Sequence, residues 1–485
     1  MDEKINKIRE FIPKFYEELN YEIYLNYSGL KDTLNTSEIY EKYSFLIDKE
    51  LALKIKNKDR RLNYISSFIQ GMYINKKTSK IRDKIATVEA NTFIEYEGKK
   101  INYRIVPIVI ANESRREIRK ILYKERIKSF YPINKYYIKL WKAMNQASRN
   151  LGYKNYLEYC SFINLKDYEK LKQKAQQFLV KTKSLYVDLM YENFKKINLD
   201  FYESERHDLS FFFRASKFDN MFVKEKMMQV FNNFLEDFGL SLKNFPNIIL
   251  DIETREKKVT RAFVSPVKVP DRIYLVITPK GGQDDYLALF HEAGHAFHFA
   301  NISKDLDVEY KYLGPSSITE AFAFLFEYLL IEKEFLKRYF DLNFEYLKFQ
   351  YLYKLYFLRR YCSKLIYEIE LNTKGVNKEA GFLYKKIMEE NMITKHERVN
   401  FLNDIDPGMY TGEYLEAWFF EAQLKRYLKD KYGEDWFIKN KARDLLIKLW
   451  NQGFKYTLEE ICNKLGYKGI EINYIIEEIL SGLGY

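Results

Sequence analysis

Three of the five histidines in this chain lie in one short segment, His291-Glu-Ala-Gly-His-Ala-Phe-His298. Residues four apart on a helix lie one turn apart on the same face, so His291 and His295 can direct ring nitrogens at one ion. Zinc accepts such ligands in a tetrahedral shell and lowers the pKa of a bound water towards about 7. Glu292, next to the first histidine, can take the proton of that water. The spacing predicts a hydrolytic zinc site, in preference to a helix that only buries its histidines and exposes Glu292.

A zinc ion that does chemistry usually has a third protein ligand and an open position. Glu320 is the candidate, since it follows His295 by 25 residues on an apolar helix introduced by residues 314–317. Ser317-Ile-Thr-Glu320 also matches a capping box, in which Glu320 would only close the first helical turn. With the histidine pair intact and no other His or Cys ligand nearby, we predict Glu320 as the ligand. Glu327, seven residues further on, shares that face and can support the site without binding the ion.

Turn signals and short strands surround the predicted metal helix. Residues 281–283, Gly-Gly-Gln, interrupt the preceding element, and Asp284 or Asp285 can cap the helix that follows. Three short strands are predicted before it, at 247–252, 259–264 and 272–278. The strand at 272–278 lies directly upstream, where it is able to pair with an extended peptide beside the site.

The rest of the chain predicts a mainly α protein. Only 19 glycines and 9 prolines occur in 485 residues, which favours long helices over a turn-rich β architecture. The exception before the metal segment is a hairpin near 90–108, where two strand-like runs flank Glu97-Gly98. We expect one body over residues 1–485, with a mostly helical part at 1–240 and a catalytic part at 241–485.

The formal charge of +12 raises a nucleic-acid or anionic-membrane partner as an alternative. Lys and Arg are, however, interleaved with Asp and Glu, and the densest stretch, residues 114–128, mixes both signs at helical spacing. This pattern is typical of a solvated helix surface. A non-catalytic basic binding protein is the remote alternative, and it would bind nucleic acid in a salt-sensitive manner that survives zinc removal.

Cysteine usage and hydropathy bear on the compartment. Cys160, Cys362 and Cys462 are far apart and odd in number, so no disulfide framework or paired metal motif follows from them. Residues 1–19 are charged throughout and contain no apolar signal core. The most apolar stretch, 318–331, contains two glutamates and is too short to span a bilayer. We expect a cytoplasmic protein with no membrane or nucleic-acid partner.

The metal segment resembles that of the M3 family of zinc peptidases, the thimet oligopeptidase and oligoendopeptidase F group. The family pattern HExGHxxH is matched by His291, Glu292, Gly294, His295 and His298. The family's ligand glutamate and a further glutamate seven residues later are matched by Glu320 and Glu327. Looser similarity extends from about residue 135 to the end of the chain.

The resemblance includes Tyr410 and Tyr414, which stand four apart like a tyrosine pair that the family places over the zinc to stabilise the oxyanion. In a chain with 42 tyrosines, two packing tyrosines are the alternative. The chain departs from the family at three places. Ala417 occupies a third tyrosine position, and Phe322-Ala-Phe324 replaces Pro-Ser-Gln. The family's histidine before the pair is missing, and the nearest one, His396, would act through another geometry or lie on the surface.

The resemblance implies a gluzincin fold, a large helical ellipsoid with a deep substrate channel and a small β element beside the zinc helix. It implies one zinc ion per chain and an oligopeptidase that hydrolyses internal bonds of short unfolded peptides, with Glu292, Tyr410 and Tyr414 as catalytic residues. A zinc carboxypeptidase or dipeptidyl carboxypeptidase is the nearer alternative, and it needs a cation for the substrate's free carboxylate. The candidates for this cation are Arg359, Arg360 and Arg398. The oligomeric state stays open.

Overall fold

The computed structural model describes residues 1–259 and 262–485 and is 70% helical, which confirms the predicted mainly α class. One strand prediction, at 259–264, falls partly on Thr260 and Arg261, which lie outside the described residues. Within the described ranges, no helix combines the length and the apolar character needed to cross a membrane.

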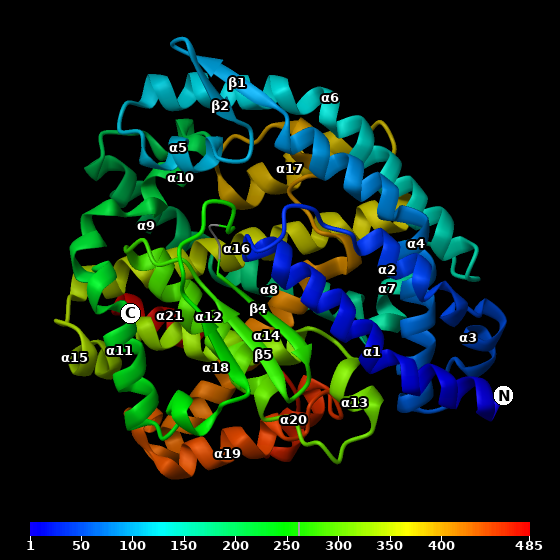
Figure 1. Ribbon diagram of the computed structural model, residues 1–485. Coiled ribbons are helices and arrows are strands. Elements are labelled where there is room, and N and C mark those ends of the chain that lie inside the picture. The colour runs from blue at the N-terminus through cyan, green and yellow to red at the C-terminus, as the bar shows by residue number, and fades with distance from the viewer. Residues whose placement is uncertain (260–261) are drawn as a thin grey trace.

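Helices form both halves of the chain, and a small sheet lies against α1 and α12 (Figure 1). The helices before the sheet are α1 (Asp2–Tyr27), α2 (Thr36–Lys42), α3 (Lys49–Ile55), α4 (Arg60–Ala90), α5 (Val106–Asn112), α6 (Arg116–Arg149), α7 (Tyr156–Ile163), α8 (Tyr168–Lys181), α9 (Lys183–Lys196), α10 (Arg206–Arg214) and α11 (Lys224–Asp237). The helices after it are α12 (Gln283–Ala300), α13 (Val308–Tyr312), α14 (Ser317–Glu327), α15 (Lys333–Tyr339), α16 (Phe344–Lys374), α17 (Ala380–Met392), α18 (Tyr410–Tyr432), α19 (Asn440–Trp450), α20 (Leu458–Lys464) and α21 (Asn473–Leu483).

The predicted hairpin is present as β1 (Phe93–Tyr96) and β2 (Lys99–Asn102), paired antiparallel. Its turn residues Glu97 and Gly98 have φ angles of 49° and 74°. Two successive positive φ angles are those of a tight hairpin turn whose twist matches the strands on either side. The hairpin lies against α6, at the edge of the molecule that Figure 1 shows at the top.

The second sheet has the strand order β3 (Ile248–Asp251), β5 (Arg272–Val276), β4 (Phe263–Lys268). The central strand β5 runs parallel to β3 and antiparallel to β4, so both of its edges are already hydrogen-bonded. The prediction that the strand at 272–278 pairs with a peptide is therefore wrong, because a peptide needs a free edge.

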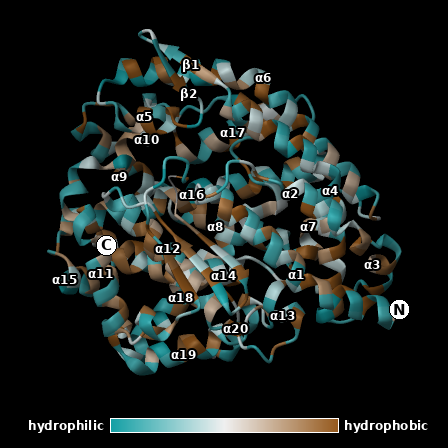
Figure 2. Ribbon diagram, viewed as in Figure 1, coloured by the Kyte–Doolittle hydropathy of each residue, from teal (hydrophilic) through white to brown (hydrophobic). Residues whose placement is uncertain are grey.

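The sheet packs on α12, and α12 packs on α14, so these elements form the centre of the fold. Ten of the eleven residues of α14, Ser317–Phe326, are buried. Figure 2 shows hydrophobic residues concentrated on these central elements and hydrophilic ones on the outer helices. A helix enclosed almost all round, as α14 is, has few ways to shift, so it is a rigid support for the side chains it carries.

The turn before α12 is built differently from the prediction. The helix begins at Gln283, its N-cap is Gly282 with a φ angle of 87°, and no side chain caps it. The Asp285 carboxylate instead accepts a hydrogen bond from the Gly281 backbone N–H at 2.8 Å. The expectation that Asp284 or Asp285 caps the helix is wrong, since Asp285 holds the preceding loop.

The three cysteines are free and buried in different helices, Cys160 in α7, Cys362 in α16 and Cys462 in α20. Burial raises the pKa of all three thiols, that of Cys462 to about 12. A buried thiol with a raised pKa forms little of the reactive thiolate at neutral pH.

Candidate metal centre

The structure brings His291, His295 and Glu320 together. Each offers one ligand atom, and the three atoms lie within 4.8 Å of one another. Nε2 of His291 is 3.4 Å and Nε2 of His295 is 3.5 Å from the same carboxylate oxygen, Oε2 of Glu320. The side chains are 16%, 11% and 4% exposed. Two imidazoles and one carboxylate in this arrangement leave space for a fourth, non-protein ligand on a tetrahedral ion.

The far sides of both imidazole rings are held by hydrogen bonds. Nδ1 of His291 lies 2.8 Å from Oε2 of Glu327, and Nδ1 of His295 lies 2.7 Å from the Thr319 hydroxyl. A partner at Nδ1 fixes the ring and leaves Nε2 to face an ion. Glu327 therefore lies where the sequence predicted it, in contact with His291. Thr319 was missed, because no local pattern connects its hydroxyl with a histidine 24 residues earlier on another helix.

The start of α14 excludes the capping-box interpretation of Glu320. The N-cap is Ser316, which makes no side-chain cap, and the Ser317 backbone N–H donates to Glu413 at 2.7 Å. The Glu320 carboxylate points instead at the histidines, and its Oε2 atom is buried without a hydrogen-bond partner. A buried carboxylate oxygen is almost always satisfied. An unpaired carboxylate oxygen close to two imidazole nitrogens is the arrangement expected around a bound metal cation.

A buried ionic cluster fixes α14 against α18. Lys166, from the loop between α7 and α8, lies 3.0 Å from Oε1 of Glu413 and also contacts Glu416, both on α18. Its ammonium group donates to the Ser317 hydroxyl at 3.0 Å. Lys166 is 151 residues away from Ser317 in the sequence, and no local pattern connects the two. Sequence reasoning missed this cluster for that reason.

Gly294 sets the distance between α12 and α14. A Cβ atom at this position would lie 2.4 Å from the Phe322 carbonyl oxygen and 2.6 Å from the Ala323 Cα atom. Both neighbours are backbone, so neither can move without displacing α14. The glycine thus lets the helix with the two histidines approach the helix that carries Glu320.

Glu292 is partly buried on α12, between the two histidines along the chain. Burial raises its pKa, while the nearby rings of His295 and His291 act in the opposite direction. Glu292, the predicted proton acceptor, thus lies beside the three predicted metal ligands and is not one of them. A carboxylate with a raised pKa is a stronger base than an exposed one.

Tyr410 is joined directly to the centre. Its hydroxyl donates to Oε1 of Glu320 at 2.6 Å. Gly408 and Met409, which precede it, have φ angles of 81° and 57°, so the chain turns sharply before α18 begins at Tyr410. Tyr414 lies behind it, with the two ring centroids 5.0 Å apart. Of the predicted pair, Tyr410 contacts a predicted ligand, and Tyr414 packs against Tyr410 and Phe324.

Aromatic packing occupies the places where the chain departs from the family pattern. Phe324 lies against the His291 ring, with centroids 5.2 Å apart, and stacks on Trp418 at 4.6 Å. Ala417 is a fully buried residue of α18. Glu327 thus contacts one nitrogen of His291, and the Phe324 ring packs against the imidazole in a T-shaped arrangement. Both contacts hold the imidazole in place.

The two remaining histidines near these segments are buried and lie away from the donors. His298 packs against Phe322 at 5.1 Å and Phe454 at 5.5 Å, and burial lowers its pKa to about 3. His396 has Nδ1 2.7 Å from the Thr394 carbonyl oxygen, and burial lowers its pKa to about 4. A surface position for His396 is therefore wrong, and its contacts are those of a structural residue.

The three arginines considered for an exopeptidase have other surroundings. Arg359 is fully buried and donates to the Leu179 carbonyl and the Thr182 hydroxyl. Arg360 forms an ion pair with Asp404. Arg398 is exposed and lies over the Phe382 ring at 4.9 Å. None of the three faces the centre with a free guanidinium in the described part of the chain.

No protein-family model and no curated protein matches the sequence, whereas solved structures match the fold. A protein from Bacillus anthracis str. Ames, provisionally named oligoendopeptidase F, has a TM-score of 0.64 and 15% identity, over 95% of this chain and 84% of its own. A second protein with that provisional name has a TM-score of 0.67 and 14% identity, over 99% and 91%. PZ peptidase A with an inhibitor has a TM-score of 0.63 and 15% identity, over 99% and 86%. This chain therefore has the fold of these oligoendopeptidase structures, as the resemblance implied.

Proposed function

We propose that this protein is a zinc-dependent peptidase of the M3 family that hydrolyses internal bonds of short, unfolded peptides. The observation that carries the proposal is the convergence of two imidazole Nε2 atoms on the unsatisfied, buried oxygen of Glu320. The shared fold supports it, because the similar structures include proteins named oligoendopeptidase F and PZ peptidase A.

His291, His295 and Glu320 are the residues that would hold the metal. A zinc ion supplies Lewis acidity at a carbonyl oxygen and lowers the pKa of a bound water towards about 7. The chain's own part is to present three ligand side chains, of which the two imidazole rings are already fixed by Glu327 and Thr319. Such preorganisation removes the cost of arranging the ligands during each turnover.

Glu292 carries the protons in the proposed reaction. Its carboxylate takes one proton from the attacking water as the water oxygen bonds to the scissile carbonyl carbon. The protonated Glu292 then gives that proton to the leaving nitrogen as the C–N bond breaks, so that an amine and a carboxylic acid, which keeps the second proton of the water, are released. One residue can make both proton transfers because the attacking oxygen and the leaving nitrogen are bonded to the same carbon.

Tyr410 is the group best placed to stabilise the negative charge that develops on the carbonyl oxygen. Its hydroxyl already lies 2.6 Å from Glu320. With a peptide bound, the same hydroxyl can donate to the developing oxyanion, which accepts more strongly than a neutral carbonyl. Tyr414 supports the position of the Tyr410 ring.

The test of this function compares the zinc-loaded protein with its Glu292→Gln variant on a mixed library of short peptides, read by mass spectrometry. We expect internal cleavage by the wild type alone, abolition by a chelator and restoration by zinc. Glu292→Gln should bind one zinc per chain and lose at least about a hundredfold in rate. Equal cleavage by both proteins would exclude the assigned role of Glu292.

The nearer alternative is resolved with the same library. A carboxypeptidase or dipeptidyl carboxypeptidase removes residues only from a free C-terminus, so amidated peptides would survive it. An endopeptidase cuts amidated and free peptides alike. A protein that cuts neither but binds nucleic acid without zinc, more weakly at higher salt, would instead be the basic binding protein.

A further inference from the structure

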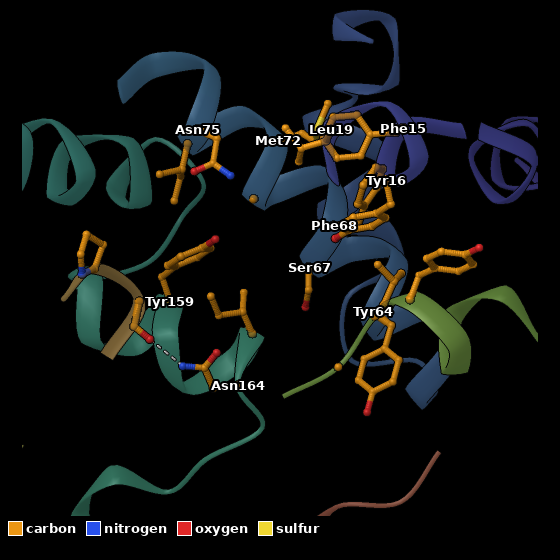
Figure 3. A pocket seen from close by; sticks show the side chains of 18 of the residues that line it. Phe15, Tyr16, Leu19, Tyr64, Ser67, Phe68, Met72, Asn75, Tyr159 and Asn164 are labelled. Carbon is orange, nitrogen blue, oxygen red and sulfur yellow. Dashed lines mark hydrogen bonds between the residues drawn. The ribbon is translucent and has the colours of Figure 1, made fainter. Parts of the chain in front are cut away.

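A cavity of about 400 Å³ lies between the N-terminal helices and the segments that lead into the metal centre. Figure 3 shows Phe15 and Tyr16 of α1 and Phe68 of α4 on one side of it, with Tyr159 of α7 on the other. Tyr40, Tyr64, Tyr156 and Tyr312 also line it. Eight aromatic side chains therefore contribute to its wall, and six of them are tyrosines with a hydroxyl group. A cavity of this size accommodates one or two amino-acid side chains.

The cavity adjoins the reacting groups through two stretches of its wall. Gly408 lines it and precedes Tyr410 by two residues, so the two Cα atoms lie within about 8 Å. The Asn164 amide donates to the Gly408 carbonyl at 2.8 Å, which ties that segment to α7 (Figure 3). Residues 312–314, also in the wall, lead directly into α14. An extended peptide advances about 3.3–3.6 Å per residue, so one that crosses the centre reaches this cavity within a few residues.

Arg82 of α4 is a cation in this wall. Its Nε atom is buried and has no hydrogen-bond partner, and no acidic side chain in residues 1–259 or 262–485 forms an ion pair with it. Arg82 lies close enough to the Tyr40 and Tyr159 hydroxyls for its charge to offset part of the rise in their pKa that burial causes. Elsewhere in the fold a comparable guanidinium, Arg360, is paired with a carboxylate.

An arginine enclosed by aromatic rings and lacking an acidic partner favours a carboxylate ligand. The guanidinium presents a planar fork of donors that matches a carboxylate in two parallel hydrogen bonds. Aromatic walls lower the local dielectric and strengthen that pair. They also bind a large apolar side chain by its buried area.

We propose that this cavity is a substrate subsite that takes a bulky apolar residue of the peptide and pairs a peptide carboxylate with Arg82. The inference rests on the proposed peptidase function and names its substrate class, acidic peptides with a large apolar residue near the carboxylate. The carboxylate belongs either to the C-terminus or to an Asp or Glu side chain, and the experiment separates the two sources.

The test uses one amidated parent peptide without acidic residues, a series with a single Glu moved along it, and the parent with a free C-terminus. For the wild type we expect a kcat/KM at least about tenfold higher for one of the carboxylate peptides than for the parent, mainly through KM. Arg82→Gln should lower kcat/KM for the favoured carboxylate peptide at least about tenfold more than for the parent, and Arg82→Lys should keep part of the preference. The peptide that gains identifies the source of the carboxylate.

A second variant tests the cavity itself. Gly71 lines it, and a Cβ atom there would meet only the Tyr159 hydroxyl, at 4.0 Å. Gly71→Leu therefore adds a side chain in the cavity wall at a position where its first atom meets no backbone. We expect it to raise KM for peptides with a bulky residue near the carboxylate and to spare peptides with alanine there.

Two results would overturn the subsite. One is that the wild type cuts the amidated parent with the same kcat/KM as every carboxylate peptide. The other is that Arg82→Gln lowers kcat/KM for all peptides by the same factor. Failure of the proposed function is recognised separately, by binding fluorescent versions of the same peptides to the Glu292→Gln protein. If nothing is cut but the carboxylate peptides still bind about tenfold more tightly than the parent, and only when Arg82 is present, the subsite stands and the peptidase does not.

Discussion

Hydrogen bonds from neighbouring side chains decide which nitrogen of each histidine faces Glu320. Glu327 and Thr319 engage the two Nδ1 atoms, and Tyr410 engages the second oxygen of the Glu320 carboxylate. A neutral imidazole has one donor and one acceptor nitrogen, so a proton held at Nδ1 leaves Nε2 as the acceptor. The protein therefore orients His291, His295 and Glu320 before a metal ion binds.

Tyr410→Phe removes the hydroxyl that lies nearest to the proposed oxyanion and keeps the ring. We predict that kcat falls by about 10²–10³, the usual cost of one lost oxyanion donor, with zinc content unchanged. Tyr414→Phe is the matched control on the same helix face and should lower kcat less. Steady-state kinetics of both variants on one cleaved peptide is the measurement, and equal losses would contradict the assignment to Tyr410.

The sequence predicted the three converging side chains, but not the residues that hold them in place. His291 and His295 follow from helical spacing alone, because residues four apart must share a face. The sequence allowed two interpretations of Glu320, as a metal ligand or as a capping-box residue. The contact of Ser317 with Glu413, 96 residues away, argues against the capping box. Thr319 could not be singled out, because a hydroxyl in a helix has many local partners and the useful one is on another helix.

At the scale of the elements, the centre depends on how α12, α14 and α18 are held together. Turn signals at 281–283 and 314–317 predicted where α12 and α14 begin, and the hairpin turn at Glu97-Gly98 was also predicted. The sheet was predicted less well: β4 occupies Phe263–Lys268 where the sequence suggested 259–264, and β5 is central where a free edge was expected. Strand order depends on pairing between distant segments, which local propensity does not contain.

Gly294→Ala tests the contact between α12 and α14. The added methyl group would overlap the Phe322 carbonyl, so the helices must separate. We predict a loss of about 1–3 kcal/mol in the free energy of unfolding, together with weaker zinc binding. Urea denaturation and a zinc titration measure the two effects. Gly71→Ala, at an open position in the helix α4, should be neutral or slightly stabilising, and a Gly294→Ala protein that behaves the same way would refute the role of the close approach.

Lys166→Met tests the contact between α14 and α18. It leaves Glu413 and Glu416 buried or half-buried near Ser317 without their cation. We predict a loss of about 3–5 kcal/mol in the free energy of unfolding, as for other buried pairs with one partner removed. The double variant Lys166→Met/Glu413→Gln should recover part of it, because one uncompensated charge is gone. No recovery in chemical denaturation would mean that Lys166 acts through packing alone.

At the scale of the whole molecule, Asp404 joins segments from both halves of the chain. Its carboxylate pairs with Arg206 of α10 and Arg360 of α16, and it accepts a hydrogen bond from the Tyr384 hydroxyl of α17 at 2.7 Å. Burial alone would raise the pKa of Asp404, but the charges of Arg206 and Arg360 lower it well below its ordinary value of 3.8.

A carboxylate with a depressed pKa in the folded state stabilises the fold above the unfolded pKa and loses that effect as pH falls. We therefore predict that the wild type loses stability steadily below about pH 4, as the unfolded chain takes up a proton that the folded chain refuses. Asp404→Asn should be less stable at pH 7 and should show a shallower decline between about pH 4 and pH 2. Thermal melts of both proteins over this range are the measurement, and parallel curves would exclude Asp404 as a source of the slope.

The three buried cysteines can report how often different regions of this chain open. Cys160, Cys362 and Cys462 lie in α7, α16 and α20, and none belongs to the metal centre. A thiol reagent can reach each one only when its own region opens, so the labelling rate at each sulfur reports the frequency of that opening. Measured for the peptide that contains each cysteine, the three labelling rates would show whether the α7 wall of the aromatic cavity opens independently of the α16 and α20 regions, with no substitution introduced.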